Sequence, residues 1–454
     1  MTEILWRKGA SAILSSALIL TLSGCGAKPA PAEEEAESET EPTAETVTPE
    51  TSEPRAVENG SSDTASEWKA KRREAWVDYV QTQAGNDTMH EEIEAQAMKY
   101  GDVTMRFTTE VVGEKPENGY PLYIALHGGG EGDTPDVNDS QWEDMQGYYR
   151  NNLDCGVYVA CRGVRDTYDT HSNPESYPLY DRLIQYMILK EDVDPNRVYL
   201  EGFSAGGDGV YQISCRMPDR FAAVNMSSGH PNNIPLDNLY RLPIMLQAGD
   251  GDTDYDRNTM TARYGVLLDS LQSEYPDGYE HRVLIHYDRG HNYEDYAADP
   301  VQVITNYAEW VSDPANTTPQ LETTDSFPPH YMAGFTRNPT PESLIFDLGT
   351  RAELRSTEFF YYLSAPYDTK GKITVSVKDN CVIVTTENLE GDFQIWFNED
   401  MIDFDNPVHF SVDGHEKELT LTPDEELLKQ TTADRGDPSF QFEASVSYSD
   451  LVSD

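Results

Sequence analysis

Between residues 103 and 287 the chain alternates short apolar runs with longer segments of helical periodicity. Short apolar runs that end at Gly, Pro, Asn or Asp are typical of strands, and the longer segments are typical of helices. The expected strands are 103–112, 120–126, 156–160, 197–201, 222–226, 243–248 and 282–287. The expected helices are 141–152, 177–190, 208–216, 258–274 and 295–311. This alternation predicts an α/β fold with a doubly wound, mostly parallel sheet.

The pattern changes on both sides of this region. Helical spacing of aromatic and aliphatic residues over 64–100, continuing from Met89 to Tyr100, predicts an N-terminal helical segment, so the α/β domain is expected to cover 64–313. Prolines among Thr, Asn and Asp predict a linker over 314–329. Beyond it we expect mainly strands, at 343–348, 358–363, 373–378, 382–386, 393–397, 408–412 and 418–421. Evenly spaced strands with turn residues between them predict a β-sandwich accessory domain over 330–454.

The first 63 residues have the features of a processing segment and a tether. Residues 1–25 combine a basic start with a short apolar run, which predicts a signal peptide. The sequence Leu22-Ser23-Gly24-Cys25 resembles the lipobox of bacterial lipoproteins, which implies lipidation of Cys25. The alternative is an ordinary secretory signal in which Cys25 is incidental. Residues 26–63 are rich in Pro, Ala, Glu, Ser and Thr, and predict a disordered acidic tether.

The net charge and the cysteine content limit the kinds of partner and metal site that the sequence predicts. The 454 residues carry a formal net charge of −48, which argues against nucleic acid because phosphate binding needs clustered Lys and Arg. The lipobox-like sequence makes a bacterial membrane an expected partner. The protein would be lipid-anchored on the extracytoplasmic face of that membrane. The five cysteines show no metal-binding spacing, so we expect mostly free, buried thiols.

One short motif suggests the chemistry. Gly202-Phe203-Ser204-Ala205-Gly206 follows an expected strand directly and precedes an expected helix. In that context Gly-x-Ser-x-Gly is typical of a nucleophile elbow, a tight turn that exposes the serine hydroxyl above the edge of the sheet. The alternative is a glycine-rich turn without chemistry.

An activated serine needs a base and an acid to orient that base. His291 follows the last expected strand, at the sheet edge where Ser204 is expected, and is the candidate base. Asp252, after strand 243–248, is the candidate acid, and Asp254 is the reserve. Alternating aspartates also suggest a calcium loop. Tyr255 and Thr261, however, stand where an EF-hand needs Gly and Glu.

Two backbone N–H groups are candidates for the oxyanion hole. One belongs to Ala205, next to the nucleophile, and the other to Gly129, in the glycine run that follows strand 120–126. His127 is expected to shape this loop, and His230 is a candidate pocket residue.

Together, Leu126-His127-Gly128-Gly129, the 194–200 segment, the serine motif, the 218–223 segment and Gly290-His291 resemble the polyhydroxybutyrate-depolymerase-like and feruloyl-esterase-like α/β-hydrolases. The resemblance implies a serine esterase that works through an acyl-enzyme, with Ser204, His291 and Asp252 as its triad and with no metal or organic cofactor. The partner that it implies is an ester substrate, polysaccharide-linked or polymeric substrates included. Two alternatives remain open: a serine peptidase of the same fold, and a non-catalytic substrate-binding lipoprotein.

Overall fold

The computed structural model describes residues 67–129, 135–232, 234–286, 289–292, 328–348 and 358–453. The predicted signal peptide, Cys25, the tether and the helix expected over 295–311 lie outside the described residues. So does most of the linker predicted over 314–329.

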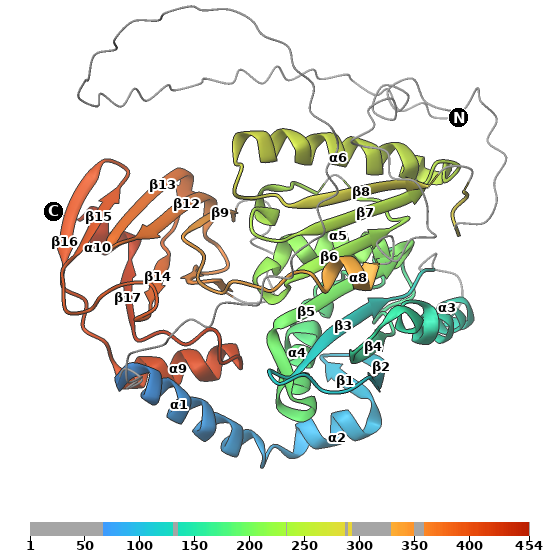
Figure 1. Cartoon of the computed structure of the whole chain (residues 1–454), viewed down its shortest axis with the longest axis horizontal. Coiled ribbons are helices and arrows are strands. Elements are labelled where there is room, and N and C mark those ends of the chain that lie inside the picture. The colour runs from blue at the N-terminus through green and yellow to red at the C-terminus, as the bar shows by residue number, and fades with distance from the viewer. Residues whose placement is uncertain are drawn as a thin grey trace, which may run out of the picture. The chain divides into compact units, whose positions relative to one another are not determined.

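The centre of the larger part is an eight-stranded sheet with the strand order β1-β2-β4-β3-β5-β6-β7-β8 (Figure 1). β1 and β2 are antiparallel to their neighbours, and the other strands run parallel to one another. The strands are β1 Ala97–Tyr100, β2 Val103–Val112, β3 Tyr120–Leu126, β4 Gly156–Cys161, β5 Val193–Phe203, β6 Ala223–Ser227, β7 Ile244–Gly249 and β8 His281–His286. The predicted fold class, a doubly wound and mostly parallel sheet, is confirmed.

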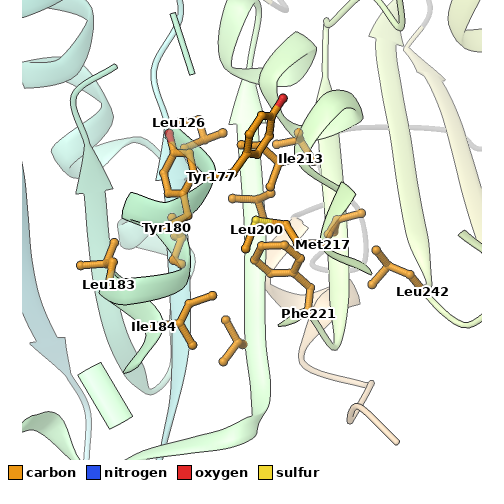
Figure 2. Close-up of a cluster of buried hydrophobic side chains, with 14 of the residues drawn as sticks. Leu126, Tyr177, Tyr180, Leu183, Ile184, Leu200, Ile213, Met217, Phe221 and Leu242 are labelled. Carbon is orange, nitrogen blue, oxygen red and sulfur yellow. The ribbon is translucent and has the colours of Figure 1, made fainter. Parts of the chain in front are cut away.

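Helices cover both faces of this sheet. α4 (Ser176–Glu191) and α5 (Ala205–Arg216) pack on one face. Their apolar side chains share a buried cluster with Leu200 of β5, as Figure 2 shows for Leu183 and Ile213. α3 (Pro135–Tyr148) and the short α8 (Pro328–Met332) contribute to a cluster on the opposite face. α6 (Arg257–Glu274) packs on β7 and β8. Because both faces are covered, the central strands β3 and β4 are apolar over most of their length.

The C-terminal part contains two sheets that share one apolar core. Their strand orders are β10-β11-β14-β17 and β16-β15-β13-β12-β9. The strands are β9 Ser343–Asp347, β10 Phe359–Phe360, β11 Leu363–Ser364, β12 Lys370–Lys378, β13 Cys381–Glu390, β14 Gln394–Phe397, β15 Val408–Val412, β16 His415–Leu419 and β17 Ala444–Ser447. The same part contains the helices α9 (Glu425–Arg435) and α10 (Tyr448–Val452). The predicted β-rich second part is therefore present.

A buried ionic cluster joins the C-terminal part to the α/β part. Arg337 donates to Asp437 at 2.9 Å, and Arg220, just after α5, approaches the same carboxylate at 3.4 Å. Arg435 pairs with Asp219, and all five side chains are at most 3% exposed. A buried charge without a partner costs several kcal/mol, so this cluster favours one mutual arrangement of the residues that form it.

The structure differs from the sequence-based expectation at several elements. The helix expected over Met89 to Tyr100 is present only in its first part. α2 (Asp87–Ala95) ends before Gln96, whose backbone adopts the left-handed conformation. β1 follows and pairs with β2. The single strand expected over 358–363 is two short strands with a turn at Tyr361, and β17 was not predicted. Cys161 and Cys215 are buried as expected, whereas Cys381 is exposed. Among the described helices, none is both long and apolar enough to cross a bilayer.

Candidate active site

The turn between β5 and α5 holds Ser204 in an unusual backbone conformation. Its φ and ψ angles are 56° and −121°, a region that non-glycine residues seldom occupy. The two glycines of the motif make this turn possible. A Cβ on Gly206 would lie 2.1 Å from the carbonyl oxygen of Leu126, and one on Gly202 would lie 2.3 Å from the carbonyl oxygen of Gly206. The local sequence therefore folds as the strained turn that the motif predicts.

Ser204, His291 and Asp252 lie in hydrogen-bonding contact. The Ser204 hydroxyl is 2.9 Å from Nε2 of His291, and Nδ1 of His291 is 2.9 Å from Oδ2 of Asp252. The backbone carbonyl of His291 accepts a hydrogen bond from Ser228, and the imidazole packs 5.2 Å from the ring of Phe203. The imidazole is thus fixed between the hydroxyl and the carboxylate, as a base that abstracts the serine proton requires.

Asp252 rather than Asp254 faces the imidazole. The side chain of Asp252 is fully buried, and its second oxygen lies 3.6 Å from Nη1 of Arg257. Asp254 is exposed in the short 3-10 helix that follows. Of the two aspartates that the sequence left open, only Asp252 contacts His291 within the described residues.

The loop after β3 places Gly129 beside Ser204. Gly129 has a φ of +100°, and a Cβ there would lie 2.5 Å from Oδ1 of Asn138, so only glycine fits this turn. Gly129, Ser204 and Ala205 line the same pocket. Ala205 is the first residue of α5, so its N–H has no acceptor within the helix and is available to a ligand. Gly130 lies outside the described residues.

Two buried histidines support this loop. Nε2 of His127 accepts a hydrogen bond from the N–H of Gly163 at 3.0 Å, which leaves the proton on Nδ1, facing the carbonyl of Gly128. The His171 ring packs edge-on against the His127 ring, and Nε2 of His171 lies 3.0 Å from the backbone carbonyl oxygen of His127. Burial lowers the pKa of His127 to about 4. Burial also lowers the pKa of His171 well below its usual range, so both rings are neutral near pH 7. His127 shapes the loop as expected.

An ionic network extends this support. Arg162 donates to Asp139 at 2.8 Å, to Asp166 at 2.5 Å and to the carbonyl of Gly163 at 2.8 Å. Asp166 in turn accepts from Asn138 at 2.8 Å. The start of α3, where Asn138 lies beside Gly129, is therefore cross-linked to the loop that follows β4.

An open pocket of about 900 Å³ has Ser204 in its wall. One wall is a face of α5, and the others come from the 168–174 loop, the segment after β6 and the acid loop. The side chains that sequence reasoning missed in this pocket are Asp208, Gln212, Arg216, Asn232 and Arg257. The four-residue spacing of 204, 208, 212 and 216 is the signal that could have revealed part of this wall, since it places them along one side of a helix.

The candidate pocket residue His230 is placed as expected. It lines the pocket, and its backbone N–H donates to Asp208 at 2.6 Å. His281 and His286 lie on β8, bonded to Asp269 and Gln247. Over the part of the chain that the structure describes, no three His, Cys, Asp or Glu side chains are grouped so as to hold a metal ion.

The strand order, the strained serine turn and the chain order Ser, Asp, His together define an α/β-hydrolase fold. The predicted resemblance to α/β-hydrolases is thus confirmed at the level of the fold.

Comparisons with known proteins agree with this class but are distant. No family model and no curated protein sequence matches the chain. A thermostable esterase structure aligns at 20% identity over 48% of this chain and 61% of its own, with a TM-score of 0.33. The LpqC poly(3-hydroxybutyrate) depolymerase of Bordetella parapertussis aligns at 17% identity over 43% and 84%, with a TM-score of 0.34. Est1E of Butyrivibrio proteoclasticus aligns at 15% identity over 48% and 100%, with a TM-score of 0.30. The fold assignment therefore rests on topology and site geometry.

Proposed function

We propose that the protein is a serine hydrolase that cleaves carboxylic esters through an acyl-enzyme. The observation that carries the proposal is the pair of 2.9 Å contacts that join Ser204 to His291 and His291 to Asp252. The solved esterases and the depolymerase noted above are consistent with ester chemistry.

The steps follow from this geometry. The Ser204 hydroxyl attacks the ester carbonyl while Nε2 of His291 takes its proton. Asp252 holds the other ring nitrogen protonated and stabilises the imidazolium. The N–H groups of Ala205 and Gly129 receive the oxyanion; one such donor typically contributes about 3–4 kcal/mol to the transition state. His291 then protonates the leaving alcohol. Water, activated by the same imidazole, releases the acid.

The experiment that tests this function compares p-nitrophenyl acetate and butyrate with aminoacyl p-nitroanilides, using the wild type and Ser204→Ala. We expect hydrolysis of the esters by the wild type at a rate at least about 10³-fold above that of Ser204→Ala. Faster cleavage of the anilides than of the esters would favour a peptidase. Equal ester hydrolysis by the two proteins would exclude the proposed enzyme.

We also propose that Cys25 is acylated and anchors the enzyme at the outer face of a bacterial membrane. The lipobox-like sequence before Cys25 supports this location. Expression in a bacterial host and extraction with detergent test it. Cys25→Ala should release the protein from the membrane fraction, and unchanged membrane retention would contradict the anchor.

A further inference from the structure

The pocket at Ser204 has a face of α5 as one of its walls. Asp208, Gln212 and Arg216 all line it, and each is four residues from the next. Residues four apart lie one above another on a helix. At about 1.5 Å per residue, Gln212 lies about 12 Å along the helix from Ser204, and the Arg216 guanidinium lies beside Gln212 because its Nη1 donates to that residue. The pocket is therefore a groove, with the nucleophile at one end and a guanidinium at the other.

Arg216 is built into the wall of this groove. It is 4% exposed, and its Nη1 donates to the backbone carbonyl and to Oε1 of Gln212, at 2.8 and 2.7 Å. Its guanidinium lies over the ring of Tyr177, at 5.2 Å from the centroid. A side chain held in this way keeps its positive charge at a fixed point, which suits the recognition of a carboxylate.

A second arginine lines the groove near its catalytic end. Arg257 stacks under the exposed ring of Tyr255, 4.9 Å from its centroid, and lies near the triad carboxylate of Asp252. Tyr255 is 60% exposed and has a φ of 58°, so its ring is presented to solvent at the rim on a strained backbone. Tyr168, 56% exposed, lies on the rim as well.

The charge of the groove contrasts with that of the chain. The protein carries 81 acidic against 33 basic residues, so an anionic ligand is repelled at a distance. Of the two acidic residues in the groove, Asp169 is exposed at the rim. Asp208 accepts the N–H of His230, and burial raises its pKa, which disfavours its charged form. Two arginines in such a groove are therefore a local exception to the overall acidity.

From this arrangement, and resting on the proposed function, we propose that the substrate is an ester of an acidic oligosaccharide. The acylated sugar lies at Ser204, and a uronate carboxylate further along the chain binds at Arg216. Gln212 and Asn232 hydrogen-bond sugar hydroxyls. The tyrosines at the rim stack on the apolar faces of the sugar rings.

The test measures binding separately from turnover. Full-length Ser204→Ala is titrated calorimetrically with trigalacturonate and with a neutral trisaccharide of the same linkage. We expect trigalacturonate to bind at least about tenfold more tightly, because a charge-assisted contact with a fixed guanidinium is worth that much. Equal affinities for the two trisaccharides would overturn the proposal.

Variants in the same Ser204→Ala background locate the effect. Arg216→Gln should lose about tenfold in affinity for trigalacturonate and little for the neutral sugar. Because Arg216 is buried, a second variant changes its neighbour Gln212. Gln212→Glu adds a negative charge to the same face of α5 and should weaken the binding of trigalacturonate but not of the neutral trisaccharide. Arg263→Gln, on the exposed side of α6, is the matched control and should change neither affinity. If Arg216→Gln and Gln212→Glu reduce the affinity for both trisaccharides equally, or for neither, the assignment is contradicted.

Turnover of p-nitrophenyl acetate by the wild type separates this proposal from the proposed function. Turnover without any preference for the acidic trisaccharide rejects the substrate class alone. A lack of turnover rejects the esterase, while the titration still decides whether the groove selects an anion.

Discussion

The most informative substitution is Asp252→Asn, because it removes one charge and keeps the shape of the side chain. The Asp252 carboxylate lies 2.9 Å from Nδ1 of His291 in a fully buried position. The centres of the two charges are then roughly 4 Å apart, which at an effective dielectric constant near 20 corresponds to about 4 kcal/mol. That energy stabilises the imidazolium only while the serine proton is in transit, so its loss lowers kcat/KM by about 10³-fold. An asparagine amide can also favour the wrong imidazole tautomer, which deepens the loss.

The assay is kcat/KM for p-nitrophenyl butyrate at pH 7.5, with thermal unfolding as a check that the variant is folded. Asp254→Asn is the matched control. It removes the same charge two residues away from an exposed side chain, so we expect activity within about twofold of the wild type. If Asp252→Asn retained activity within tenfold while Asp254→Asn lost it, the assignment of the acid would be refuted.

Three further predictions concern stability. Gly206→Ala places a Cβ 2.1 Å from the carbonyl oxygen of Leu126, a backbone atom that cannot move freely, and should cost about 3 kcal/mol or more of unfolding free energy. Burial lowers the pKa of His286 to about 4, so the unfolded state binds its proton first as the pH falls. The free energy of unfolding that the neutral His286 contributes is therefore fully present above about pH 6.5 and is lost between about pH 6.5 and 4. In urea unfolding, His286→Gln should show a smaller drop in the free energy of unfolding between pH 7 and pH 5 than the wild type. Asp437→Asn leaves the buried Arg337 uncompensated and should cost about 3–5 kcal/mol by the same method.

Each stability prediction has a control in the chain. Gly85→Ala meets no atom closer than 3.7 Å and should be nearly neutral. His90→Gln changes an exposed histidine and should leave the pH dependence unaltered. Glu342→Gln breaks a surface pair whose side chains are 64% and 70% exposed, which is worth about 0–1 kcal/mol. Equal losses in a variant and its control would contradict the corresponding argument.

The order of the α/β elements could be predicted because the chain repeats a local pattern. The buried strands from β3 to β8 are apolar runs bounded by turn residues, and the contact of Ser204 with His291 follows from the rule that parallel strands end at one sheet edge. β1 was missed because four residues show too little periodicity, and its conformation depends on pairing with β2.

Long-range contacts explain what the sequence did not show of the site. The support of the Gly129 loop depends on His127 meeting Gly163, 36 positions away. The hydrogen bond from Asn138 to Asp166 joins residues 28 positions apart. No local periodicity encodes such pairs, so they became visible only in three dimensions.

The central claim is that Ser204 is an activated nucleophile. A fluorophosphonate probe tests it most directly, with intact mass and peptide mapping as the readout. The account predicts a single adduct on Ser204, absent in Ser204→Ala and strongly slowed in His291→Ala. No labelling of the folded wild type, or an adduct that persists in Ser204→Ala, would contradict it.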